Sequence, residues 1–162
     1  MASLSCHGPR QNRYARDDFV PNNRTIYLIS CVSKKRATPA RARDLYKSEL
    51  FRRARAYVET TGCPWFILSA KHGLVDPDEV VAPYEQTLNT MRVAERRKWA
   101  EKVQAQMDER LPAAERIIIF AGKRYREFLM PYLRRRAAKV EVPMGSLRIG
   151  EQLSWLAQSH PK

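Results

Sequence analysis

Three apolar runs in this chain each end abruptly in small, hydroxylic or cationic residues. Ile26–Ile29, Phe66–Leu68 and Ile117–Phe120 are followed by SCVSKK, SAKHG and AGKRY. Core packing does not call for lysine, histidine or glycine, so another requirement placed these residues at the strand ends. In open α/β sheets, ligands lie in the crevice outside the carboxyl ends of the strands. The pattern therefore predicts a parallel sheet with one shared site at that edge, suited to an anionic or nucleotide-like ligand.

Helical patterns alternate with these runs. Apolar residues recur at helical spacing in residues 41–60, 93–110, 125–138 and 149–158. In the first of these helices, Tyr46, Leu50, Ala54 and Tyr57 are expected to face the sheet. Pro131 is expected to kink the third helix, Val140–Pro143 predicts a fourth strand, and residues 76–90 form a long loop of the kind that serves as a lid. The alternation predicts an α/β fold: a three-layer sandwich whose helices flank a mostly parallel sheet of about four strands.

The chain divides into two parts. Residues 1–24 are polar, are rich in Arg and Asn and lack an apolar period, which predicts a flexible basic N-terminal arm. The arm either contacts nucleic acid or is a plain disordered tail. Residues 25–158 are expected to form a single α/β domain, because a chain of 162 residues is long enough for one hydrophobic core.

The charge balance points to phosphate-rich partners. Lys and Arg number 30 against 17 acidic residues, a formal charge of +13, which favours nucleic acid or a nucleotide as partner. The alternative is a solvated basic surface with no dedicated partner. No apolar run approaches the ~18 residues that span a bilayer, and the N-terminus lacks the apolar segment of a secretory signal. We therefore expect no membrane association and a cytoplasmic location.

Known metal and cofactor motifs are missing from the sequence. Cys6, Cys31 and Cys63 have no CxxC spacing, which argues against a zinc ribbon or a disulfide framework. P-loop, GxGxxG, HExxH and GxSxG patterns are also absent, which disfavours the common NTPases and metal-assisted hydrolysis. No metal and no cofactor are expected.

Lys71 and His72 are the first candidates for catalysis. Histidine titrates near neutral pH and acts as a general acid or base, and a neighbouring lysine lowers its pKa and keeps the ring neutral. Gly73 permits a positive φ or a close approach of the backbone to a ligand. The alternative is a tight turn capped by Ser69, with His72 facing solvent.

A second cluster of hydroxyl and ammonium groups follows the first strand: Ser30, Ser33, Lys34 and Lys35. Such groups hold a phosphate or a carboxylate. Cys31 would be a nucleophile if a cation depressed its pKa, although a buried inert cysteine is the commoner case. Arg43, Tyr46 and Ser48 begin the next helix and would reach the same edge.

Two further groups complete the predicted site. Tyr84, in the long loop, either stacks on a base, which contributes about 1–3 kcal/mol, or fills a gap in the core. Glu85 beside it would act as a base or read an exocyclic amine. Gly122, Lys123 and Tyr125 would close the pocket from the third strand, the alternative being an ordinary basic helix start.

Several co-linear runs carry a family resemblance. SCVSKKR, ARDLY and SELF, then FILSAKHGLVDPDEV, PYEQTL and AGKRY, resemble the domain of unknown function 6884 family over about residues 24–158. The pattern L-S-x-x-x-G-L-x-x-P with a later P-Y is similar to the YaaA group, DNA-associated proteins linked to peroxide stress. S-C-x-x-K-K followed by S-x-L-F-x-x-A resembles the archaeosine-synthase domain, which modifies a deazaguanine base in transfer RNA. That domain has a proline where this chain has Ser30, and a KPY element where it has Lys35 and Arg36.

These features lead to two main functional hypotheses. The first is a nucleic-acid-associated enzyme that acts on a nucleobase or nucleotide, with base modification as its reaction class. The alternative is a non-catalytic YaaA-like DNA-binding stress-response protein that uses the arginines of residues 41–55 and the N-terminal arm. A small-molecule sensor or partner-binding module is a third.

Overall fold

The computed structural model describes residues 24–30 and 34–159 of the chain. The predicted arm over residues 1–24 therefore lies almost wholly outside the described residues, as do the candidate site residues Cys31 and Ser33.

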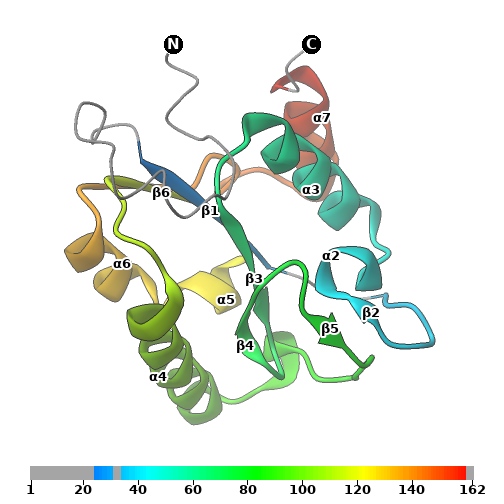
Figure 1. Cartoon of the computed structure of the whole chain (residues 1–162), viewed down its shortest axis with the longest axis horizontal. Coiled ribbons are helices and arrows are strands. Elements are labelled where there is room, and N and C mark those ends of the chain that lie inside the picture. The colour runs from blue at the N-terminus through cyan, green and yellow to red at the C-terminus, as the bar shows by residue number, and fades with distance from the viewer. Residues whose placement is uncertain (1–23, 31–33, 160–162) are drawn as a thin grey trace.

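A five-stranded sheet forms the centre of the fold (Figure 1). Its strands, in the order in which they pair, are β4 (Gly73–Val75), β3 (Trp65–Ser69), β1 (Thr25–Ser30), β6 (Arg116–Phe120) and β7 (Lys139–Glu141). β1, β3, β6 and β7 are parallel, whereas β4 pairs antiparallel with β3. β1, β3 and β6 are almost continuous apolar runs, as expected for parallel strands buried on both faces. The predicted mostly parallel sheet is confirmed, and β4 is an additional strand.

Helices cover both faces of this sheet. They are α2 (Ala42–Leu45), α3 (Glu49–Thr61), α4 (Val93–Arg110), α5 (Lys123–Arg126), α6 (Met130–Arg136) and α7 (Ile149–Ser159). α3 and α7 pack together on one side, and α4 and α6 lie on the other (Figure 1). The expected three-layer α/β sandwich is therefore present.

The first predicted helix is divided in two. Residues 34–36 pair with residues 45–47 through Arg36 N to Leu45 O and Lys47 N to Lys34 O, both 2.8 Å, and this pairing holds Tyr46 in an extended conformation. α2 therefore ends at Leu45.

α3 starts afresh after this break. Ser48 caps it by accepting a hydrogen bond from Phe51 N, and Gly62, with a φ of 75°, ends it in the left-handed conformation. The helix buries Phe51, Ala54 and Val58, whereas Leu50 and Tyr57 are only half-buried. The prediction was therefore correct for Ala54. The other two buried residues of α3 each lie one position after the residue that was predicted.

The basic helix expected over residues 125–138 is also divided, into α5 and α6. Pro131 lies in the first turn of α6, where backbone N–H groups have no partner within the helix. The N–H that proline lacks therefore costs the helix no hydrogen bond. The proline therefore starts a helix and does not kink one.

The long loop over residues 76–90 contains structure that was not predicted. β5 (Val80–Val81) pairs with β2 (Ala40–Arg41) in a small antiparallel sheet, and Leu88–Thr90 form the short 3-10 helix η3. Tyr84 and Leu88 are buried and hold this segment against the domain, while Glu85 and Gln86 are exposed.

Cys63, between α3 and β3, is buried and disulfide-bonded, which its spacing in the sequence did not predict. Among the described residues, no helix combines the length and the apolar character needed to cross a membrane.

The order of the strands fixes the position of a crevice. From β1 the chain passes through α3 to β3 on one side of β1, and then through α4 to β6 on the other side. The direction of winding therefore reverses between β1 and β6, and ligands of open α/β sheets bind at such a reversal, outside the carboxyl ends of the strands.

Candidate functional site

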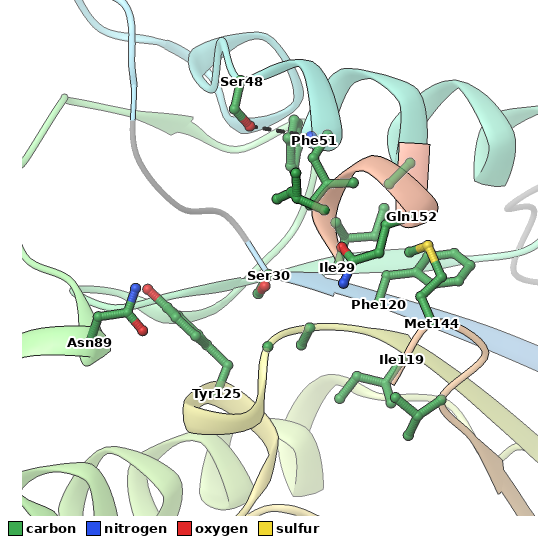
Figure 2. A pocket seen from close by; sticks show the side chains of 16 residues that line it. Ile29, Ser30, Ser48, Phe51, Asn89, Ile119, Phe120, Tyr125, Met144 and Gln152 are labelled. Carbon is green, nitrogen blue, oxygen red and sulfur yellow. Dashed lines mark hydrogen bonds between the residues drawn. The ribbon is translucent and has the colours of Figure 1, made fainter. Parts of the chain in front are cut away.

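A pocket of about 250 Å³ lies at this reversal point. Its floor is formed by the last residues of β1 and β6, and its walls by α3, α5, η3 and α7 (Figure 2). The lining is mainly apolar, with Ile29, Phe51, Ile119, Phe120 and Met144 among its members. None of the described residues that line this pocket carries a charge.

Polar groups enter the pocket from five separate segments: Ser30, Ser48, Asn89, Tyr125 and Gln152. Asn89 and Tyr125 lie on one side and Gln152, next to Met144, on the other (Figure 2). Gln152 Nε2 donates to Leu147 O at 2.9 Å, which leaves its carbonyl oxygen as an acceptor. The Tyr125 hydroxyl accepts from Leu88 N at 3.4 Å and so ties η3 to α5. The pocket therefore offers amide and hydroxyl groups within an apolar surround.

A basic groove adjoins this pocket. It is larger, about 910 Å³, and open to solvent. Its described lining consists of residues 34–37 on one side and residues 83–87 with Asn89 on the other. Asn89 belongs to the lining of both cavities, so pocket and groove meet at this side chain.

Behind the groove lies a buried cluster of hydroxyl groups. Tyr84 Oη lies 2.8 Å from Tyr46 Oη and accepts a hydrogen bond of 2.7 Å from Ser69 Oγ. The Lys35 ammonium lies 4.4 Å from the centroid of the Tyr84 ring. Tyr84 is only 8 % exposed, so its geometry fits the core-filling interpretation better than that of an open stacking platform.

Lys71 and His72 lie in the turn between β3 and β4. α4 holds this turn: Lys102 Nζ donates to Lys71 O at 2.8 Å, and Gln106 Nε2 to His72 O at 3.0 Å. His72 N donates to Ser69 Oγ at 3.0 Å, so Ser69 caps the turn as expected. The turn lies on the far side of β1 from β6, and neither Lys71 nor His72 lines the pocket or the groove.

The environment of His72 favours the neutral ring. Burial, and then the charges of Lys71 and Lys102, lower the pKa of His72, while Glu79 acts weakly in the opposite direction. The predicted effect of Lys71 is present, but burial is the larger cause. His72 Nε2 is buried and has no hydrogen-bond partner among the described residues.

Arg43 belongs to a network of ion pairs. Its guanidinium pairs with Glu59 of α3 and with Asp78, to which the distance is 2.9 Å, and it lies over the ring of Trp65. Arg43 therefore links α2 to α3 and to the loop after β4 that contains Asp78. It lines neither the pocket nor the groove.

The structure thus divides the predicted site residues into three groups. Ser30, Gly122 and Tyr125 line the pocket, and Lys34, Lys35, Tyr84 and Glu85 line the groove. Ser69, Tyr46, Lys71, His72, Gly73, Arg43 and the exposed Lys123 lie in neither lining. The predicted roles of these residues remain untested.

Ser48, which was expected to reach the carboxyl edge of the sheet, lines the pocket, whereas two of the pocket's polar residues, Asn89 and Gln152, were missed by the sequence analysis. Asn89 lies within the predicted lid and could have been suspected on that ground. Gln152 lies in α7, which is distant in sequence from every other site residue. No group of three or more metal-ligating side chains occurs in the described part of the chain.

Fold and pocket together define an α/β protein with a pocket between β1 and β6, where the winding of the chain reverses. The chain belongs to the family described as "Family of unknown function (DUF6884)", which matches residues 26–158. A relative is "Uncharacterized protein YfjM" of Bacillus subtilis (strain 168), 33% identical over 117 residues that cover 64% of this chain and 73% of that protein. No solved structure matches. The further resemblance to the YaaA group and to the archaeosine-synthase domain is not confirmed by these matches.

Proposed function

We propose that this protein is a nucleic-acid-associated enzyme that takes a nucleobase into the pocket between β1 and β6. The base is presented either as a free nucleotide or as part of a nucleic acid. The observation that supports this proposal is an uncharged pocket, lined by apolar, amide and hydroxyl groups, in a chain whose formal charge is +13.

The chemistry of the lining matches a base. A nucleobase is flat and uncharged, and aromatic side chains such as Phe51, Phe120 and Tyr125 provide surfaces against which it packs, at about 1–3 kcal/mol for a stacked base. Its edge alternates hydrogen-bond donors and acceptors, and the side-chain amides of Asn89 and Gln152 provide both kinds of group.

Glu85 is the group to which we assign proton transfer. It is the only acid among the described residues that line the pocket or the groove. Glu85 lines the groove, so its carboxylate would serve as general acid or base toward a part of the ligand that extends out of the pocket. Lys71 and His72 lie on the other side of β1, so we leave them out of the proposed reaction.

Ligand binding is tested with a variant that fills the pocket. Gly122 lines the pocket with an ordinary φ of −68°, and a Cβ at this position would meet no atom within 4 Å. Gly122→Trp therefore adds bulk without backbone strain. Isothermal titration calorimetry with a panel of bases and nucleosides should detect binding to the wild-type protein and at least about tenfold weaker binding to the variant.

Gly150→Trp is the matched control, because Gly150 also has open space around it but does not line the pocket. This control should bind like the wild type. The proposal fails if no base or nucleoside binds the wild-type protein, or if Gly122→Trp binds as well as Gly150→Trp.

Turnover is tested separately with Glu85→Gln, which keeps the shape of the side chain and removes the carboxylate. Mass spectrometry of nucleosides from cells that express the wild type should show a product that is missing with the variant. A wild-type protein that binds bases but forms no product would favour the non-catalytic alternative.

A further inference from the structure

We propose that the ligand is a nucleotide whose phosphate lies in the basic groove on Lys34 and Lys35, while its base occupies the pocket between β1 and β6. This inference rests on the proposed function and adds the phosphate site, the orientation of the ligand and the side chain between its two halves.

The pocket itself excludes the phosphate. None of its described lining residues is charged, so a phosphate inside it would be buried without a cation. Burying an unpaired charge costs far more than a few hydroxyl and amide contacts return. An anionic part of the ligand is therefore better accommodated in the groove, where cationic side chains are available.

The groove provides the missing cations. Lys34, Lys35 and Arg36 line it in succession, against the single carboxylate of Glu85. Arg36 Nε donates to Asp44 O at 2.6 Å, and its terminal nitrogens add to the positive charge that the two lysines bring to the groove. The local charge balance of three cations to one acid favours an anion.

The backbone that carries the lysines is held in place before any ligand arrives. Antiparallel pairing of residues 34–36 with residues 45–47 fixes their backbone, and the side chain of Lys35 lies over the ring of Tyr84. Such preorganisation reduces the entropy that is lost when a ligand binds.

Asn89 connects the two halves of the site. Its side chain lines both cavities, and η3, which carries it, is anchored through Leu88 N to the Tyr125 hydroxyl and through Asn89 N to Thr87 Oγ1 at 3.2 Å. Between a base in the pocket and a phosphate in the groove, this is the position of the sugar. A carboxamide is a suitable partner for sugar hydroxyls because it both donates and accepts hydrogen bonds.

The same phosphate chemistry is found in a free nucleotide and in a nucleotide of a single strand. The experiment therefore compares, by calorimetry at low salt, a nucleoside with its monophosphates and with a short oligonucleotide of the same base. If the monophosphate binds about tenfold more tightly than the nucleoside and the oligonucleotide does not, the preferred ligand is a free nucleotide. If the oligonucleotide also binds about tenfold more tightly than the nucleoside, the site accepts a nucleotide within a strand. Either gain supports the phosphate site if it depends on the two lysines.

The variant Lys34→Ala/Lys35→Met removes both charges while methionine keeps an unbranched stem over Tyr84. It should lose the gain from phosphate and keep the nucleoside dissociation constant within about twofold. The matched control is Lys98→Ala/Lys139→Met, which removes two exposed lysines that line neither cavity and should keep the gain.

Two results overturn this inference while the proposed function stands: nucleoside and nucleotide bind equally, or the gain from phosphate survives in Lys34→Ala/Lys35→Met. If no nucleoside binds at all, the proposed function itself fails, and the two failures are therefore distinguishable.

Discussion

Tyr84 both fills the core and holds one wall of the groove in place. Its hydroxyl contacts Tyr46 and Ser69, and all three side chains are buried. Buried hydroxyl groups that satisfy one another avoid a desolvation cost of about 1–3 kcal/mol for each unpaired group. The cluster therefore anchors residues 83–87, which form one wall of the groove, to the end of β3.

His72 has a measurable consequence for stability. Its pKa in the folded protein is lowered from 6.5 by burial and by Lys71 and Lys102, so the unfolded chain binds a proton more readily. The free energy that His72 contributes is fully present above the unfolded pKa and is lost as the pH falls through the folded pKa. Between about pH 7.5 and about pH 5.5, we expect the wild type to lose more unfolding free energy than His72→Gln does.

Urea unfolding of both proteins at each pH measures this difference. His7 and His160 are common to both proteins, so their contributions cancel. Parallel losses of stability in the two proteins would show that the ring of His72 titrates as it does in the unfolded chain.

At the scale of elements, the turn between β3 and β4 depends on one side chain of α4. Gln106 Oε1 accepts from Leu74 N at 2.8 Å, and its Nε2 donates to His72 O. The side-chain amide of Gln106 therefore pairs with one backbone N–H and one backbone carbonyl at the edge of the sheet. Gly73 has a φ of +78°, as the sequence predicted, and a Cβ there would overlap Gln106 Oε1. The glycine is therefore needed both for its backbone conformation and for the approach of the helix.

A double-mutant cycle separates these two reasons. We expect Gly73→Ala to destabilise the wild type by more than about 2 kcal/mol, because backbone strain and overlap with Gln106 add together. In a Gln106→Ala background only the strain remains, and the same change should cost about 1–2 kcal/mol. Denaturant unfolding of the four proteins measures the coupling, and equal costs in both backgrounds would refute the overlap.

At the scale of the whole molecule, the important feature is how the excess positive charge is divided between ion pairs and the lining of the groove. The arginines of residues 41–55 appear in the sequence as a phosphate-binding surface. In the structure, however, Arg43 and Arg55 pair with Glu59, and Arg53 pairs with Glu49. Much of this charge is therefore paired within the protein, and the role of these arginines in binding DNA stays a prediction.

The salt dependence of binding to single-stranded nucleic acid should reflect this distribution. Each neutralised phosphate contributes about −0.7 to the slope of log K against log salt concentration. We therefore expect Lys34→Ala/Lys35→Met to flatten the slope by about 0.7, since the contact with one phosphate is lost. Fluorescence anisotropy with a labelled oligonucleotide over a range of KCl concentrations provides the measurement.

Arg53→Ala is the control for this experiment, because its guanidinium is already paired at 2.8 Å. It should leave the slope nearly unchanged. If Arg53→Ala flattened the slope and the groove variant did not, the nucleic acid would lie on α3 and not in the groove.

Much of the fold could be predicted because its signals are local. Continuous apolar runs mark the buried strands β1, β3 and β6, and helical spacing marks α3, α4 and α7. The breaks at Tyr46 and before Pro131 were missed because they depend on contacts between segments: the extended conformation of Tyr46 comes from its pairing with Lys35. Helical periodicity contains no information about such a partner.

The sequence by itself determined that this chain forms a mostly parallel sheet with polar residues at its carboxyl edge, since burial and backbone preference act within each segment. Only the tertiary structure decided which of those residues share a cavity. Because β6 pairs beside β1 on the side away from β3, the pocket collects Ser30, Gly122 and Tyr125 and leaves out His72. Asn89 and Gln152 join it from a loop and a terminal helix, and their positions follow from packing that no local pattern encodes.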